Sequence, residues 1–377
     1  MKERGHPYFK GPLISEREFL AEELVPIKST LESRKFSPPI PFHNPHIQTI
    51  AGYRISPFIE RKTDIVAKRK FVEVAPGAKI ALDYSLHGYP NNRPTVVIVP
   101  GITGSSRSPF SVGVANKAIH YDFNAVRVNF RGAKDTGNSS KTLCHAGLSK
   151  DIHTVLKDIK NRELTGKIYI AAVSFGGNMV LKAVGEMGQE AQGKIGGVGL
   201  VSSVVDSENS WQNIHSHYWY ERAVLNELKN AVKRQARAYP EDWNTSLLNL
   251  LKNIKTIEEW NATYQVGPES TRWGFTDLQD YYKKASALPF VSKIAVPTFL
   301  IHAEDDPVVS ASPLKGEQFV NNPNIITVFT KHGGHGGFVD FRRTGDDLDR
   351  HWGQNRVIEF FRLLEKNTKT TRSSRVK

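Results

Sequence analysis

Six short apolar segments recur along the chain and restrict the folds that it can adopt. They lack the strict apolar–polar alternation of a half-buried strand. Such runs are typical of strands buried on both faces, as in a parallel sheet covered by helices. Segments of helical length separate most of them, which predicts an α/β fold with a mostly parallel, doubly wound sheet. The six runs are residues 95–100, 125–130, 167–174, 197–203, 297–304 and 325–330.

Further elements complete this predicted core. Two more polar, β-rich segments, 65–74 and 79–88, predict a leading pair of strands. Helices are expected between the strands, and a last amphipathic helix is expected near the end of the chain. The predicted helices are residues 108–121, 146–164, 175–188 and 355–364.

One long interval interrupts the alternation of strands and helices. About ninety residues between Ser203 and Pro297 contain no convincing strand, but they include two helical segments, 221–239 and 245–260. We expect this insertion to form a helical cap over one end of the sheet. The proline-dotted first 62 residues predict an extended arm with one short helix at 16–24. The predicted division is an arm at 1–62, core segments at 63–205 and 291–365, a cap at 206–290 and a disordered basic tail at 366–377.

Composition narrows the class of protein. Hydrophobic residues make up 39% and charged residues 24% of 377 residues, which excludes a wholly disordered or fibrous chain. The single cysteine, Cys144, excludes an intrachain disulfide. The first residues lack the apolar core of a signal peptide, and no apolar run is long enough for a transmembrane helix. We therefore expect a cytoplasmic protein that can contact a membrane only peripherally.

The net charge of +13 is spread widely along the chain. Such an excess is compatible with an anionic membrane or with no specific partner. No nucleic-acid-binding motif accompanies it, so nucleic acid is not an expected partner. A basic stripe on one predicted cap helix, Lys229, Lys233 and Arg237, is either a solvated face or a contact with anionic lipid. The aromatic run from Trp211 to Tyr220 either packs the cap or lines the entrance for an acyl chain.

The strongest chemical signal lies at the end of the run 167–174. There Ala172-Val173-Ser174-Phe175-Gly176 joins a strand to a helix. A small residue two positions before the serine and a glycine two positions after it define the nucleophile elbow of serine hydrolases. Ala172 stands where glycine is usual, so the motif alone also fits an incidental strand–helix turn. If the elbow forms, Ser174 is the nucleophile.

An acid and a base follow in the expected order. Asp306 comes directly after the strand 297–304, where the acid of a catalytic triad belongs, and neighbouring Asp305 is its rival. His335 is flanked by glycines after the last strand and is the expected base, with His332 as its rival. The His332–His335 pair could also bind a metal, but no third ligand accompanies it. We expect neither a metal nor an organic cofactor.

An oxyanion hole is also predicted. The loop Gly101-Ile102-Thr103-Gly104 follows the third strand, and it lacks the pattern of a nucleotide-binding loop. In a hydrolase of this kind, one backbone N–H from that loop and one from the residue after the nucleophile hold the developing oxyanion. These donors would be the N–H groups of Ile102 and Phe175.

A series of motifs across residues 40–360 resembles one specific family. It is similar to the YheT-like branch of the α/β hydrolases, which includes α/β-hydrolase domain-containing proteins 1, 2 and 3, yeast medium-chain ethanol acyltransferases and plant embryogenesis-associated proteins. The resemblance implies an α/β-hydrolase fold and a triad of Ser174, Asp306 and His335. The motifs are Pro45-His46-Ile47-Gln48-Thr49-Ile50, Gly101-Ile102-Thr103-Gly104, Asn129-Phe130-Arg131-Gly132, His145-Ala146-Gly147 with Asp151, Ser174-Phe175-Gly176-Gly177-Asn178, Tyr281-Tyr282 with Ser286, Asp305-Asp306-Pro307 and Gly333-Gly334-His335-Gly336-Gly337-Phe338.

The resemblance and the residues together predict a serine hydrolase that cleaves carboxylic esters of short to medium acyl chains. Its partner would be a small-molecule acyl ester, and its acyl-enzyme would be released by water. Two alternatives remain at this point: an alcohol acyltransferase that uses the same acyl-enzyme, and a non-catalytic binding scaffold. Residues 257–261 depart from the Phe-Asp pair that similar proteins carry there, which leaves the preferred acyl length open.

Overall fold

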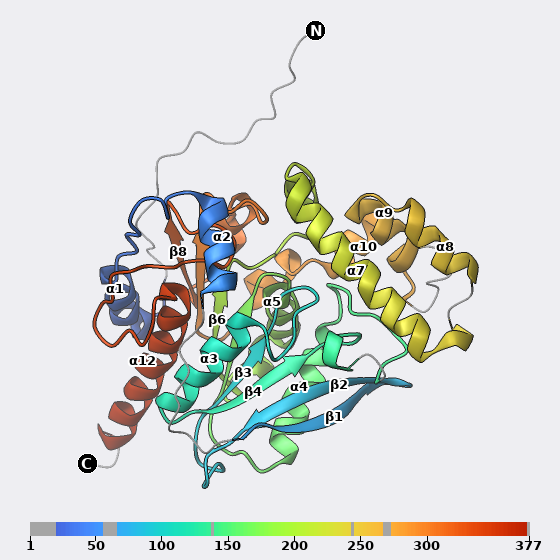
Figure 1. Ribbon diagram of the computed structural model, residues 1–377. Helices are drawn as coiled ribbons and strands as arrows, with labels where there is room; N and C mark the ends of the chain where they lie inside the picture. Colours follow the sequence, from blue (N-terminus) through green and yellow to red (C-terminus); the bar gives the residue numbers. More distant parts are fainter. Residues whose placement is uncertain (1–19, 56–65, 137–138, 243–244, 267–272, 375–377) are drawn as a thin grey trace.

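The computed structural model describes residues 20–55, 66–136, 139–242, 245–266 and 273–374, and it contains an eight-stranded sheet with helices on both faces (Figure 1). The strand order is β1-β2-β4-β3-β5-β6-β7-β8. The β1–β2 and β2–β4 pairs are antiparallel, and all others are parallel, so the predicted mostly parallel sheet is confirmed. The strands are β1 Lys68–Ala75, β2 Ala78–Ser85, β3 Thr95–Val99, β4 Asn124–Asn129, β5 Ile168–Val173, β6 Ile195–Val201, β7 Thr298–Ala303 and β8 Ile325–Thr330.

The apolar runs lie in the centre because their side chains alternate between two cores. In β3, Val97 and Val99 pack with α4 (Ser149–Asn161) and α5 (Phe175–Met187) on one face. Val96 and Ile98 point to the other face, toward α1 (Val25–Ser33), α3 (Pro109–His120) and α12 (Trp352–Ser374). Because successive side chains of a strand point to opposite faces and both faces are buried here, consecutive positions of the strand must be apolar.

The N-terminal segment differs from the predicted extended arm. It contains a 3-10 turn, η1 (Glu22–Leu24), followed by α1 and then α2 (Pro45–Arg54); the start of the predicted helix at 16–24 lies outside the described residues. The extended-arm prediction was wrong because proline can begin a helix as well as break one. Pro45 occupies the first turn of α2, and the Asn44 side chain caps it by accepting the N–H groups of His46 and Ile47.

The described residues of the cap form helices joined by short loops and contain no strand. The helix predicted at 221–239 is confirmed as α7, which begins three residues earlier. The prediction of a single helix over 245–260 is wrong. The segment forms two helices, and the second begins after Thr256, which forms a capping box with Glu259. Figure 1 shows α7 to α10 gathered on one side of the sheet. The cap helices are α6 Ser207–His215, α7 Tyr218–Ala238, α8 Thr245–Asn253, α9 Ile257–Asn261 and α10 Leu278–Ala285.

The last helix is longer than predicted. It was expected at 355–364 with a disordered tail from 366, but α12 runs from Trp352 to Ser374. No glycine or proline follows Gly353, so the sequence contains no residue that would end the helix earlier. The structure therefore describes helix as far as Ser374, within the tail for which disorder was predicted.

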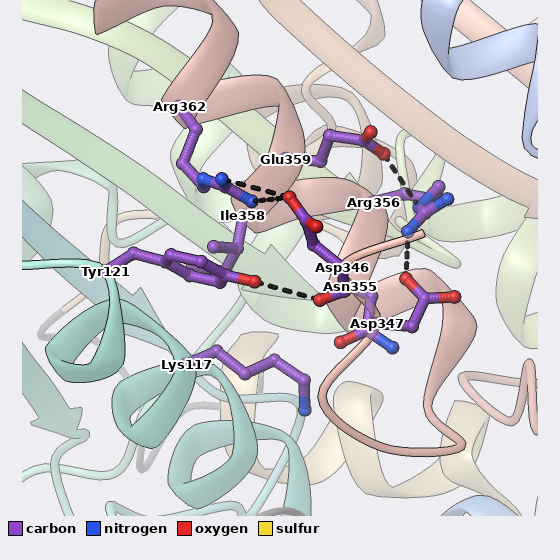
Figure 2. A pocket seen from close by; sticks show the side chains of 9 residues that line it. All are labelled: Lys117, Tyr121, Asp346, Asp347, Asn355, Arg356, Ile358, Glu359 and Arg362. Atoms are coloured by element: carbon purple, nitrogen blue, oxygen red, sulfur yellow. Dashed lines mark hydrogen bonds and ion pairs between the residues drawn. The ribbon is translucent and has the colours of Figure 1, made fainter. Parts of the chain in front are cut away.

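Ion pairs fix α12 to the loop before it (Figure 2). The Arg356 guanidinium bonds Asp347, and both side chains are buried. Arg362 pairs with Asp346 at 3.2 Å, while the Tyr121 hydroxyl at the end of α3 donates to the Asp346 carbonyl at 2.8 Å. Because the Arg356–Asp347 pair is buried, removing either side chain alone would leave an unpaired charge in the interior and destabilise the fold. Within the described residues, no helix combines the length and apolar character that a membrane crossing requires.

Candidate active site

Ser174 lies in a tight turn between β5 and α5. Its φ of 55° is in the left-handed region, which a residue other than glycine rarely adopts. The two glycines after Phe175 allow the turn, because a Cβ at Gly176 would lie 2.2 Å from the Pro100 carbonyl oxygen and one at Gly177 would lie 2.1 Å from Ser203 Oγ. Ala172 is fully buried in β5, so its methyl group is accommodated in the core. The strand–turn–helix context of the predicted elbow is present.

His335 lies between Ser174 and Asp306. Its Nε2 is 2.9 Å from Ser174 Oγ, and its Nδ1 is 2.9 Å from Asp306 Oδ2. The three residues follow different strands, β5, β7 and β8, whose carboxyl ends meet at one edge of the sheet. This is the relative placement of a nucleophile, a base and an acid.

Asp306 is held as a carboxylate despite its burial. Burial opposes the charge, but attraction to His335 and the hydrogen bonds that Asp306 accepts outweigh it, so the pKa of Asp306 is lowered. Its Oδ1 accepts the backbone N–H groups of Val308 at 2.8 Å and Val309 at 2.9 Å. These bonds fix the carboxylate toward His335 Nδ1.

The rival residues form a separate pair. Asp305 Oδ1 accepts the Gly334 N–H at 2.9 Å, and its Oδ2 is 3.4 Å from His332 Nδ1. The His332 ring stacks on His43, with 4.5 Å between centroids. Burial raises the pKa of Asp305, the opposite direction to its neighbour. The structure therefore brings Ser174, Asp306 and His335 together and leaves Asp305 and His332 beside them.

The predicted oxyanion loop lies against the serine. A Cβ at Gly101 would be 3.4 Å from Ser174 Cβ, and the loop turns tightly, with Thr103 at φ 57° and the Gly104 N–H bonded to the Gly101 carbonyl at 3.0 Å. The N–H groups of Ile102 and Phe175 donate to no protein acceptor among the residues that the structure describes. Both groups are therefore available to a ligand oxygen.

A pocket opens beside this loop, between the core and the cap. Its wall is mostly apolar, and α7 and α9 contribute Leu228, Ala231 and Trp260. Arg131 on the wall is neutralised by a bidentate pair with Asp151. The remaining lining residues are Ile102, Thr103, Gly104, Phe130, Gly132, Ala133, Leu143, Cys144, Phe175 and Arg234.

The sequence prediction missed the contribution of α2 to this site. Gln48 on α2 is fully buried, and its amide bonds both backbone groups of Val339, accepting the N–H at 2.8 Å and donating to the carbonyl at 3.0 Å. Thr49 Oγ1 accepts the His335 N–H at 2.9 Å. Gly52 permits close approach, since a Cβ there would lie 2.7 Å from Gly337 Cα. The available signal was the Asn44–Pro45 helix start, which places these residues on one helical face.

Metal and thiol chemistry find no support in the described residues. They contain no group of three or more histidine, cysteine or acidic side chains that could hold a metal ion. Burial raises the pKa of the Cys144 thiol, which disfavours the reactive thiolate.

A sheet of this topology with a serine, a histidine and an aspartate at its strand ends defines the α/β-hydrolase class. The sequence pattern of the family described as alpha/beta hydrolase fold matches residues 94–341, and the chain belongs to that family.

Relatives and solved structures agree with this assignment. The chain is 28% identical to the putative esterase YheT of Escherichia coli, over 81% of this chain and 88% of that protein. It is 27% identical to a monoacylglycerol lipase of Saccharomyces cerevisiae, over 72% of this chain and 60% of that one. The structure of the esterase Pf2001 of Pyrococcus furiosus matches with a TM-score of 0.50 and 14% identity, over 81% of this chain and 96% of that one, which supports the fold alone. These relatives support hydrolase activity.

We expect Asp306→Asn to lower kcat for p-nitrophenyl butyrate by about 10⁴-fold, because the amide holds the imidazole in the wrong tautomer. The matched control is Asp305→Asn, which keeps the Oδ1 acceptor for the Gly334 N–H. The control should retain activity. Steady-state kinetics in which the control loses activity and Asp306→Asn keeps it would reverse the assignment.

We expect Gln48→Leu to reduce the free energy of unfolding by at least about 2 kcal/mol, because the backbone groups of Val339 lose their partner in a buried site. Since Val339 follows the loop of His335, kcat should fall more than KM rises. Denaturant unfolding and kinetics measure both effects, with Gln212→Leu on the exposed surface of α6 as control. Wild-type stability and kcat in Gln48→Leu would contradict the role of α2.

Proposed function

We propose that this protein is a serine hydrolase that cleaves carboxylic esters of short to medium acyl chains. The observation that carries the proposal is the position of His335, with one ring nitrogen 2.9 Å from Ser174 Oγ and the other 2.9 Å from Asp306. A histidine held in this way is aligned to accept the serine proton, even before a substrate is bound.

In the proposed acylation step, Ser174 Oγ attacks the ester carbonyl carbon while its proton passes to His335 Nε2. The carbonyl oxygen gains the negative charge and accepts hydrogen bonds from the N–H groups of Ile102 and Phe175. As the tetrahedral intermediate collapses, His335 returns the proton to the departing alcohol. The products of this step are the free alcohol and an ester of Ser174.

In the deacylation step, water attacks the acyl group and gives its proton to His335. The carboxylic acid leaves, and Ser174 regains its proton from His335. Asp306 stays ionised through both steps, because its environment lowers its pKa, and it stabilises the imidazolium without taking its proton. No step requires a metal or an organic cofactor.

The apolar pocket favours an acyl chain over a charged group near the carbonyl. Leu228, Ala231 and Trp260 supply apolar contacts from the cap, and each buried CH₂ group of an acyl chain gains about 0.8 kcal/mol. The alternative activity, acyl transfer to an alcohol, would use the same acyl-enzyme with a different acceptor. The assembled hydrogen-bond chain argues against a non-catalytic scaffold.

The nucleophile can be tested with Ser174→Ala. This variant should lose about 10⁶-fold in kcat for p-nitrophenyl butyrate and should no longer be labelled by a fluorophosphonate probe. Ser292→Ala, at an exposed position, is the control and should keep both. Circular dichroism checks that the fold is intact. Labelling of folded Ser174→Ala would rule out Ser174 as the nucleophile.

The acyl preference can be tested with p-nitrophenyl esters from acetate to palmitate. We expect kcat/KM to rise about tenfold for every two carbons until the pocket is filled, with a preference for chains of about four to ten carbons. Ala231→Leu should shift the optimum to shorter chains because it reduces the pocket. Ala236→Leu, on the same helix outside the pocket lining, is the control. A steady fall from acetate onward would exclude the medium-chain preference while leaving the hydrolase assignment intact.

A further inference from the structure

Helix α2 has the opposite amphipathic arrangement to an ordinary surface helix. Its inward face carries Gln48 and the small residue Gly52, which contact the backbone of the His335 loop. Its large apolar residues, Ile47, Ile50 and Tyr53, point to solvent, and Ile50 is 57% exposed. A surface helix of a globular protein normally buries its apolar stripe. The outward face of α2 therefore lacks the apolar environment that its side chains favour.

The exposed apolar surface continues onto the cap. At the start of α7, Trp219 is 77% exposed and Tyr218 is also exposed. The His46 ring on α2 lies 3.0 Å, Nδ1 to hydroxyl oxygen, from Tyr220, which joins the two helices. Figure 1 shows α2 and one end of α7 at the same edge of the molecule. We call this surface the α2 patch; it consists of Ile40, Ile47, Ile50, Tyr53, Tyr218 and Trp219.

Four exposed arginines flank the α2 patch. Arg54 ends α2, while the other three lie on the loop 340–351, which contacts the α2 segment through Phe42 and Phe341 (4.7 Å between ring centroids). His351 Nε2 on the same loop is 3.2 Å from the carbonyl oxygen of Ile55. None of the four forms an ion pair with a carboxylate of the described residues. The flanking arginines are Arg54, Arg342, Arg343 and Arg350.

We propose that the α2 patch is a docking surface for an anionic phospholipid membrane. Isoleucine side chains can enter the boundary between headgroups and acyl chains, and tryptophan and tyrosine favour that same boundary because one end of each is polar. Unpaired arginines beside them attract anionic headgroups, each strengthening binding about fivefold. Burial and then the Glu227 carboxylate raise the pKa of Tyr53, so Glu227 is an acidic exception, on the α7 side, to a border that is otherwise basic.

The location of the α2 patch links docking to the active site. The opposite face of α2 bonds the loop that carries His335, through Gln48 and Thr49. A membrane bound at the α2 patch would therefore contact the helix whose other face holds the loop of His335. This link rests on the proposed hydrolase function, whereas membrane binding itself does not.

Co-sedimentation with vesicles of equimolar phosphatidylcholine and phosphatidylserine tests the proposal. We expect the full chain to bind these vesicles and to bind phosphatidylcholine vesicles weakly. The variant Ile47→Ser/Ile50→Ser should bind at least about tenfold more weakly, because it removes two large apolar groups from the contact. The control, Phe71→Ser, removes an exposed aromatic residue from β1 and should bind as the wild type does.

A second pair of variants tests the basic border. Arg342→Ser/Arg343→Ser should weaken binding to the anionic vesicles by at least about tenfold. Lys233→Ser/Arg237→Ser removes the same charge from the exposed stripe on α7 and should have little effect. Equal losses in both variants would show that net charge alone drives binding, and would overturn the proposed location.

Three further outcomes decide the proposal. Docking at the α2 patch is supported if every variant retains p-nitrophenyl butyrate hydrolysis while only Ile47→Ser/Ile50→Ser and Arg342→Ser/Arg343→Ser lose hydrolysis of an ester embedded in vesicles. Wild-type binding by Ile47→Ser/Ile50→Ser overturns it. A concentration-dependent dimer in light scattering that this variant abolishes also overturns it, because the patch would then be a contact between two copies of the chain.

Discussion

The turn at Ser174 is the constraint around which the site is arranged. A left-handed conformation at a serine costs on the order of 1–3 kcal/mol and persists only where the surrounding structure imposes it. Here the Ser174 N–H donates to the Val201 carbonyl at 3.1 Å, and the Ser174 carbonyl accepts the Val204 N–H at 3.1 Å. Both ends of the turn are thus fixed to β6 and the residues after it. The strained backbone directs the side chain out of the sheet, toward His335.

The adjacent aspartates show how strongly position within a turn governs chemistry. Asp306 faces the buried side, where the imidazole and two backbone N–H groups stabilise its charge and lower its pKa. Asp305 accepts the Gly334 N–H and lies beside His332, and burial raises its pKa. One step along the chain therefore separates a carboxylate whose pKa is lowered from one whose pKa is raised and which accepts the Gly334 N–H. The proposed catalytic role of Asp306 therefore rests on which groups its side chain contacts, since the residue type is the same at both positions.

The sequence predicted those features that depend on local pattern. The strand at 95–100 and the serine turn at 172–177 have signatures in adjacent residues, and both are present. The brace between Gln48 and Val339 could not be predicted in the same way, because it joins residues 291 apart. Thr256 is an intermediate case: its capping box with Glu259 is a local signal, and it was hidden by the apolar period that continues across it.

The exposed apolar face of α2 follows from what its inner face must do. Gly52 and the backbone of Gly337 approach so closely that no larger side chain fits between them. The inner face of the helix is therefore restricted to small residues and to Gln48, which satisfies backbone groups of the segment that follows the His335 loop. A helix that packs this closely on a backbone segment cannot place isoleucine on the face that points toward the core of the protein. Apolar residues on α2 can be stabilised only from outside, so holding the His335 loop and offering an apolar surface are two consequences of the same packing.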